Sequence, residues 1–154
     1  MAVVCNVYGQ GVQAIVEGDI ALTSDTIKVA LFNDSHSFNE AHSTWANVKG
    51  NQITGTNYNH AAGGLEITHG VEDAVSYAAG IVSFGVNAED SAWANSTITA
   101  YHAVVYQYVD DAGSPDDASR LLCSVNFDGA EISADGSFTI EWHADGIFRF
   151  AVNP

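Results

Sequence analysis

The feature that most constrains the fold of this chain is a series of short segments in which residue character alternates. In the segment 26–33, Ile27, Val29 and Leu31 share one face, while Lys28 lies on the other. Side chains of a β-strand point alternately to its two faces, so a period of two predicts a strand with one buried face. Six further segments show this pattern, and they cover residues 63–71, 82–86, 97–109, 120–127, 137–142 and 147–152.

Turn residues separate the last of these segments. An Asp-Gly pair suits a two-residue hairpin turn, because both residues tolerate a positive φ. Such turns are expected at Asp128-Gly129, Asp135-Gly136 and Asp145-Gly146. Short strands spaced about 8–12 residues apart are typical of sandwiches and barrels. The sequence therefore predicts an all-β fold, a two-sheet sandwich of jelly-roll-like type.

The segment 97–109 is the longest of the predicted strands, and both of its faces are apolar. Ile98 and Val104 lie on one face, and Tyr101 and Val105 lie on the other. Apolar residues on both faces are typical of a strand that is buried on both sides, so a central position in a sheet is expected.

One short N-terminal helix is expected over residues about 7–17. Tyr8, Val12 and Ile15 would share one face of it, and Asn6 is a suitable N-cap. A helix with glycines inside it is weak by itself, so it should depend on docking this face against a sheet.

The 154 residues suit a single domain, 1–154, with one core. The polar stretch at about 34–59 is the longest expected irregular segment, and segments of that length are usually functional or mobile.

Charge is very unequal in this chain, with 19 acidic residues against 4 basic ones and a formal net charge of −15. No run of basic residues occurs, so binding to nucleic acid or to an anionic membrane surface is not expected. The acidity suits solubility, or a salty medium that would screen it. The sequence shows neither a secretory signal nor a membrane-spanning run, and we expect a soluble protein made in the cytoplasm.

Patterns that would indicate catalysis or a structural metal are not found. The sequence has no His-Glu-x-x-His, Cys-x-x-Cys or Gly-x-Ser-x-Gly motif. We therefore expect no enzymatic activity and no cofactor. Cys123 is in phase with apolar neighbours and is expected to be a buried free thiol, with a Cys5–Cys123 bridge as the alternative. The acidic loop 110–117 is expected to be a solvated hairpin, with a bound calcium ion as the alternative.

Three stretches of the chain resemble a known group of proteins. They are Asp-Thr-Ile-Lys-Val-Ala-Leu at 25–31, Trp-Ala-Asn-Ser-Thr-Ile-Thr-Ala-Tyr-His-Ala-Val-Val-Tyr at 93–106, and Gly-Ser-Phe-Thr-Ile-Glu-Trp at 136–142. In this order they resemble small structural proteins of tailed-phage virions, which are similar to capsid decoration (cement) proteins. The resemblance implies a virion location on the capsid surface, with the major capsid protein and copies of the chain itself, as a dimer or trimer, for partners. It implies no catalytic residue.

Aromatic side chains expected in loops are the candidates for the partner interface, because Trp and Tyr are frequent hot-spot residues. They are Phe32, Phe38, Trp45, Tyr58 and Trp93. The alternative for each is that it caps the core of the sandwich.

Other functions are compatible with the same sequence. Within a phage particle, the chain could instead belong to the neck, tail or baseplate. A carbohydrate-binding, lectin-like module is a further alternative, because jelly rolls host many sugar sites. Its aromatic platform would be Trp45 with Asn47, or Trp93 with Asp90 and Asn95. A glycan-cleaving enzyme with paired carboxylates is the third alternative.

Overall fold

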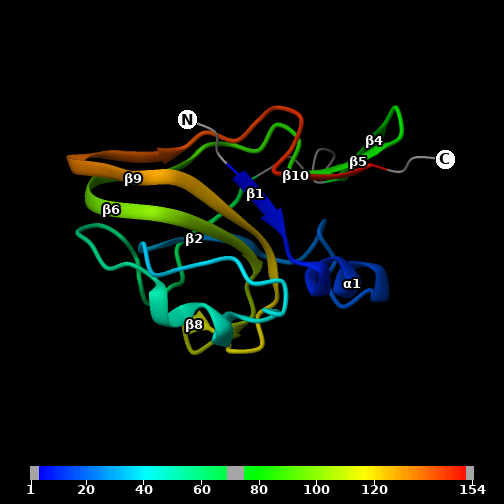
Figure 1. Ribbon diagram of the computed structural model, residues 1–154, viewed down its shortest axis with the longest axis horizontal. Coiled ribbons are helices and arrows are strands. Elements are labelled where there is room, and N and C mark those ends of the chain that lie inside the picture. The colour runs from blue at the N-terminus through cyan, green and yellow to red at the C-terminus, as the bar shows by residue number, and fades with distance from the viewer. Residues whose placement is uncertain (1–3, 69–74, 152–154) are drawn as a thin grey trace.

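Antiparallel strands dominate the structure, a computed structural model that describes residues 4–68 and 75–151. Figure 1 shows the strands together with one α-helix in these residues. The largest sheet has the order β1-β9-β6-β2-β3 and consists of β1 (Val4–Val7), β9 (Leu121–Ile140), β6 (Ser91–Gln107), β2 (Ile27–Phe32) and β3 (Leu65–Glu66). A second sheet has the order β10-β5-β4 and consists of β10 (Phe148–Ala151), β5 (Ile81–Phe84) and β4 (Val75–Ala78). The short hairpin of β7 (Asp110–Asp111) and β8 (Ser114–Pro115) forms the third. The mainly β architecture predicted from the alternation is confirmed.

The pair β6–β9 forms the longest ladder of the fold, with strands of 17 and 20 residues. The prediction that Asp128-Gly129 and Asp135-Gly136 end strands is wrong, because β9 runs through both dipeptides. The pairs Ala100–Glu131 and His102–Asn126 leave residues 127–130 of β9 opposite a single residue of β6. Asp128 has a φ of 60° and Asp135 a φ of 53°. The residues with positive φ therefore lie in bulges, which bend the long strand and do not reverse the direction of the chain.

The third dipeptide, Asp145-Gly146, does lie in a turn, in which the Gly146 N–H donates to the His143 carbonyl oxygen at 3.0 Å. This turn does not close a hairpin between its flanking strands. It leads from β9 into β10, which pairs with β5 of the second sheet.

The central strands of the large sheet are buried on both faces over part of their length. The burial predicted for 97–109 holds for 103–107, whereas Thr97 and Thr99 are exposed and Val109, beyond the end of β6, is 44% exposed. In β2, Val29 and Leu31 belong to the main apolar cluster, whereas Ala30 and Phe32 belong to a second cluster on the opposite face. The irregular segment that follows β2 covers this second face. It contains two 3₁₀ turns, η1 (Trp45–Asn47) and η2 (Lys49–Asn51).

Helix α1 (Gly9–Glu17) starts later than predicted, and Tyr8 occupies its N-cap position. The prediction that Asn6 is the N-cap is wrong, because Asn6 belongs to β1, where it pairs with Ser124 of β9. The helix ends at Gly18, whose φ of 84° is left-handed and whose N–H bonds the carbonyl oxygens of the last turn. Tyr8 is fully buried, but Val12 and Ile15 are only half-buried, so the predicted docking face is confirmed only in part. The buried residues of the helix itself are Gly11 and Ala14.

Two of the expected strands are shorter than predicted. The segment 63–71 keeps only the two-residue β3, and Val71 lies outside the described residues. The segment 82–86 becomes β5, which ends at Phe84, because the following Gly85 takes a left-handed φ of 68° that does not continue a strand. Within residues 4–68 and 75–151, the helix is too short and too polar to cross a bilayer.

Candidate protein-contact surface

The aromatic residues predicted to form a partner interface lie mostly in the core. Phe32, Trp45, Tyr58 and Trp93 are all buried, and the exposed fraction of Trp45 is 3%. Phe32 and Trp93 are strand residues, in β2 and β6, and the prediction that they lie in loops is wrong. Phe38 is half-buried, with its ring 4.9 Å from that of Tyr8. The structure thus places these four buried residues in the core-capping positions that were the alternative for them.

The side chain of Trp45 is enclosed by other aromatic rings, so it exposes almost no surface to a partner. Its ring stacks on Tyr106 at 4.5 Å and meets the edge of Phe32 at 5.9 Å. Its backbone N–H donates to the Ser119 carbonyl oxygen at 2.7 Å, which fixes η1 against the chain that enters β9. The Asn47 side chain accepts hydrogen bonds from the backbone of 43–44, so this pair does not form the exposed platform expected of a lectin.

Trp93, the second tryptophan considered for sugar binding, is buried between aromatic neighbours. Its ring lies 5.9 Å from Tyr58 and 5.8 Å from Phe138. A ring enclosed in this way cannot stack on a sugar without opening the core. Neither predicted platform is therefore accessible in this structure.

A different part of the molecule has the character of a contact surface. Residues 4–16 and 75–88 contain no Asp, Glu, Lys or Arg, although the chain has 19 acidic residues. These two stretches, far apart in sequence, supply α1, β4 and β5, which meet with β10 at one end of the molecule (Figure 1). We call α1, β4, β5 and β10 together the apolar end. Its charged members are Glu17, at the last position of α1, and Arg149, which pairs with Asp145 at 3.5 Å.

A groove of about 510 Å³ runs across the apolar end, between α1 and the second sheet. Val12 and Val16 of α1 line one side, and Val75, Val82 and Phe84 of the sheet line the other. None of the described residues that line it has a charged side chain. Val16 is 82% exposed, which is unusual for an aliphatic residue of a helix beside an apolar groove. Exposed, contiguous apolar surfaces of this kind are typical of sites that contact proteins, membranes or ligands.

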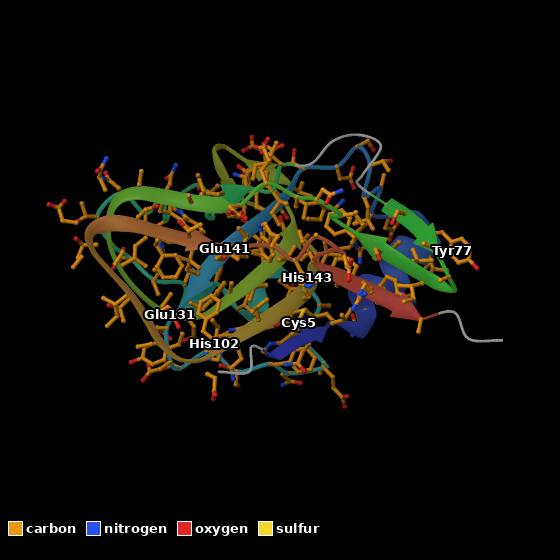
Figure 2. The ribbon with its side chains drawn as sticks, turned by 90° about the horizontal axis from the view of Figure 1, so that it is seen from above. Cys5, Tyr77, His102, Glu131, Glu141 and His143 are labelled. Atoms are coloured by element: carbon orange, nitrogen blue, oxygen red, sulfur yellow. The ribbon has the colours of Figure 1, made fainter. Side chains whose placement is uncertain are left out.

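The strand β4 extends this surface to the periphery of the molecule. Val75 is 39% exposed and Tyr77 is 69% exposed. Figure 2 shows Tyr77 projecting outward from β4, at the opposite side of the molecule from the bend of β9. The nearest acidic residues before β4 in the sequence, Glu72 and Asp73, lie outside the described residues.

The rest of the surface is dominated by carboxylates. The four basic residues are all engaged in contacts, three with carboxylates and one over an aromatic ring. These contacts are Lys49–Asp117, Arg120–Asp19, Arg149–Asp145 and Lys28 over the ring of Tyr108. Within residues 4–68 and 75–151, most acidic side chains form no ion pair with Lys or Arg, so the surface outside the apolar end carries a negative field.

The loop considered for calcium is held by directed hydrogen bonds. The Asp110 carboxylate accepts from the Tyr108 hydroxyl at 2.6 Å and from the Gly113 N–H at 3.0 Å. Asp116 accepts from the Ala118 N–H, and Asp117 pairs with Lys49. In the described part of the chain, no three side chains of His, Cys, Asp or Glu are grouped so as to hold a metal ion.

A second groove, of about 700 Å³, lies in the bend of β9. Phe127 and Phe138 are among the residues that line it, together with Cys5, Glu131 and His143, which are labelled in Figure 2. Cys5 is exposed, Cys123 is buried, and both are free thiols. Because Cys5 is opposite Val125 and Val7 is opposite Cys123, the two thiols are diagonal neighbours on one face of the sheet. They share a hydrogen bond, which lowers the pKa of Cys5 against the opposing effect of burial.

Sequence patterns alone missed the apolar end, although a signal for it was present. Charged residues make up 15% of the chain, so the 14 residues of 75–88 would carry about two of them at the average density. Comparison of the chain with protein-family models, curated proteins and solved structures finds no match in any of the three.

Proposed function

We propose that this protein is a capsid decoration (cement) protein, a non-enzymatic component that binds the outside of a phage shell and stabilises it by protein–protein contact. Two independent lines support the proposal. One is the resemblance of the segments 25–31, 93–106 and 136–142 to small virion proteins. The other, which carries most weight, is the division of the surface into an apolar end and an acidic remainder.

This division suits a protein that works as one of many closely spaced copies. The apolar end supplies the water-excluding contact that protein association needs, with an exposed helix face around Val16 and an exposed strand around Tyr77. The acidic remainder, with a net charge of −15, keeps neighbouring copies soluble and prevents indiscriminate aggregation.

The proposal includes the finer fold expected from the sequence, a two-sheet sandwich of jelly-roll-like type. Support comes from the composition of the main apolar cluster. It contains Phe84 and Phe148 of the second sheet together with Val29 and Leu31 of the large sheet. Residues of two sheets that share one core are expected of a sandwich.

Quantitative mass spectrometry of purified virions tests the location. The expected result is a fixed simple ratio to the major capsid protein, with hundreds of copies in each particle. A handful of copies would overturn the decoration role and place the chain in the neck, tail or baseplate. If the chain is not found in the particle, the proposed virion function is wrong in all its forms.

A reconstitution experiment tests the stabilising role. Purified chain is added to shells from which it has been removed, and the temperature at which they release DNA is measured. We expect this temperature to rise with added chain until the sites are saturated, because a ligand that binds only the intact shell stabilises it. An equal amount of an unrelated acidic protein serves as the control. No rise at saturating concentration would contradict the cement function.

A further inference from the structure

We propose that the apolar end is closed by a second copy of this chain, in a symmetric dimer in which β4 of one copy pairs with β4 of the other. The inference rests on the proposed function in taking the apolar end as a protein-contact surface, and it names the partner that occupies it.

The first observation is the open edge of β4. In the second sheet, β4 is the last strand, and it bonds only to β5. Among the described residues no strand pairs with its outer side, so the backbone N–H and C=O groups of alternate residues in Val75–Ala78 face outward there. An uncovered edge is a ready template for another strand, unless charged residues or proline block it. The four residues of β4 include neither.

The second observation selects a copy of the same chain over another protein. Two chains that each carry a net charge of −15 repel one another wherever their acidic surfaces approach. At physiological salt this repulsion acts over about 8 Å. A basic partner would be attracted to the acidic surfaces, and it would gain no electrostatic attraction from an uncharged surface. A like-charged partner can approach closely only where neither side brings carboxylates, and β4 and β5 bring none.

The third observation is the geometry of the side chains on β4. In the β4–β5 ladder, Val75 is opposite Phe84 and Tyr77 is opposite Val82. Phe84 and Val82 both line the groove, so Val75 and Tyr77 lie on the groove side of the sheet. A two-fold axis through Ser76 would place Val75 opposite the partner's Tyr77, and Tyr77 opposite the partner's Val75.

This register joins the two exposed apolar residues of the edge strand into cross-strand pairs. Aromatic and β-branched residues directly opposite each other are a favourable combination in antiparallel sheets. The two three-stranded sheets would become one continuous sheet, and the two grooves would lie on the same side of it. The interface is isologous, because the same patch of both copies meets itself.

Sedimentation equilibrium of the purified full chain tests the proposal. The expected species is a dimer of the 16.2 kDa chain, which dissociates on dilution. The Tyr77→Glu variant places a carboxylate in the centre of the interface and should weaken the dimer at least about tenfold. Tyr77 is exposed, so the variant should still fold, and a measurement of its thermal unfolding tests this expectation. Ile132→Glu is the matched control, because Ile132 is 67% exposed on β9 and the change in charge is identical. The control should leave the dimer intact.

Any other outcome contradicts the proposed dimer. A chain that stays monomeric at hundreds of micromolar, or that forms a trimer, contradicts the two-fold pairing. A dimer that Tyr77→Glu leaves unchanged places the interface elsewhere. These results are separate from the count of chains in virions. A monomer found at high copy number would remove the dimer alone, and a dimer missing from virions would remove the proposed function alone.

Discussion

The Nε2 atom of His36 lies 3.1 Å from the hydroxyl oxygen of Ser124, a residue 88 positions later in the chain. His36 begins the segment that covers the second face of the large sheet, and Ser124 lies within β9. Both side chains are buried. The imidazole also contacts the ring of Phe32 at 4.8 Å and that of His102 at 5.2 Å. This hydrogen bond therefore ties a loop to the sheet inside an aromatic environment.

The burial of His36 predicts that stability falls in mildly acidic solution. Burial, with smaller contributions from His102 and His42, lowers the pKa of His36 from 6.5 to about 4. The unfolded chain takes up a proton near pH 6.5, but the folded chain does not until about pH 4. Stability is therefore fully present above pH 6.5 and is lost progressively down to pH 4, by on the order of 3 kcal/mol. Urea unfolding at several pH values measures the loss.

A variant isolates the contribution of this residue to the pH dependence. His36→Asn keeps a polar side chain but cannot be protonated in this range, so its stability should depend less on pH between 6.5 and 4. His102 lies beside it, and burial lowers the pKa of His102 too, against the opposing effect of Asp34. If His36→Asn retains the full pH dependence, another group is responsible and the assignment to His36 fails.

The contact between α1 and β9 predicts that Gly11→Ala is destabilising. A Cβ at Gly11 would lie within 2.2 Å of the Leu121 carbonyl oxygen, so the helix must move away from the strand. Overpacking of this kind typically costs about 1–3 kcal/mol. Gly9→Ala is the control in the same helix, because a Cβ there meets nothing within 4 Å. It should leave stability unchanged or raise it by up to about 1 kcal/mol. Equal effects of the two changes on thermal unfolding would contradict this packing.

The enclosed position of Trp45 predicts that Trp45→Ala strongly destabilises the fold. Loss of a buried tryptophan leaves a cavity over Tyr106 and should lower the free energy of unfolding by about 3–5 kcal/mol. Phe38→Ala, at a half-buried neighbouring position, should cost clearly less. Denaturant unfolding compares the two. If Trp45→Ala cost less than about 1 kcal/mol, Trp45 would return to the candidates for a partner interface.

The two cysteines should differ sharply in reactivity. Cys5 is exposed and its pKa is lowered by the hydrogen bond from Cys123, so its thiolate forms more readily than that of a free cysteine. Cys123 is buried, and its pKa is raised by the same hydrogen bond and by desolvation. A thiol reagent should label one site per chain in the native protein and two in denaturant. Mass mapping identifies the site, and early labelling of Cys123 would contradict the β1–β9 pairing.

Alternation in the sequence predicted the strands well, because it depends only on the apolar or polar character of successive side chains. The segment 26–33 became β2, and the segment 97–109 belongs, as far as Gln107, to β6, which is central in the sheet. The Asp-Gly pairs show where prediction from neighbouring residues fails. Asp128-Gly129 is compatible with a turn or a bulge, and the long ladder with β6 decides between them.

Burial of the aromatic residues could not be predicted from their neighbours in sequence. Trp45 lies in a polar stretch, yet it is covered because Tyr106 and Phe32, from distant strands, form its environment. The apolar end was missed for the same reason. The segments 4–16 and 75–88 each lack charge, but only the fold brings α1 beside β4 and β5.

The pairing of β1 with β9 has a consequence for the order in which the chain can fold as it is made. Val7 is opposite Cys123, which lies 116 positions later in the sequence. A ribosome releases β1 before β9, so β1 must wait without its neighbour until β9 has emerged. Contacts of such long sequence separation slow folding, because the intervening loop must be closed before they form. Of these two strands, the one that is synthesised first can therefore take its place only after the other has been made.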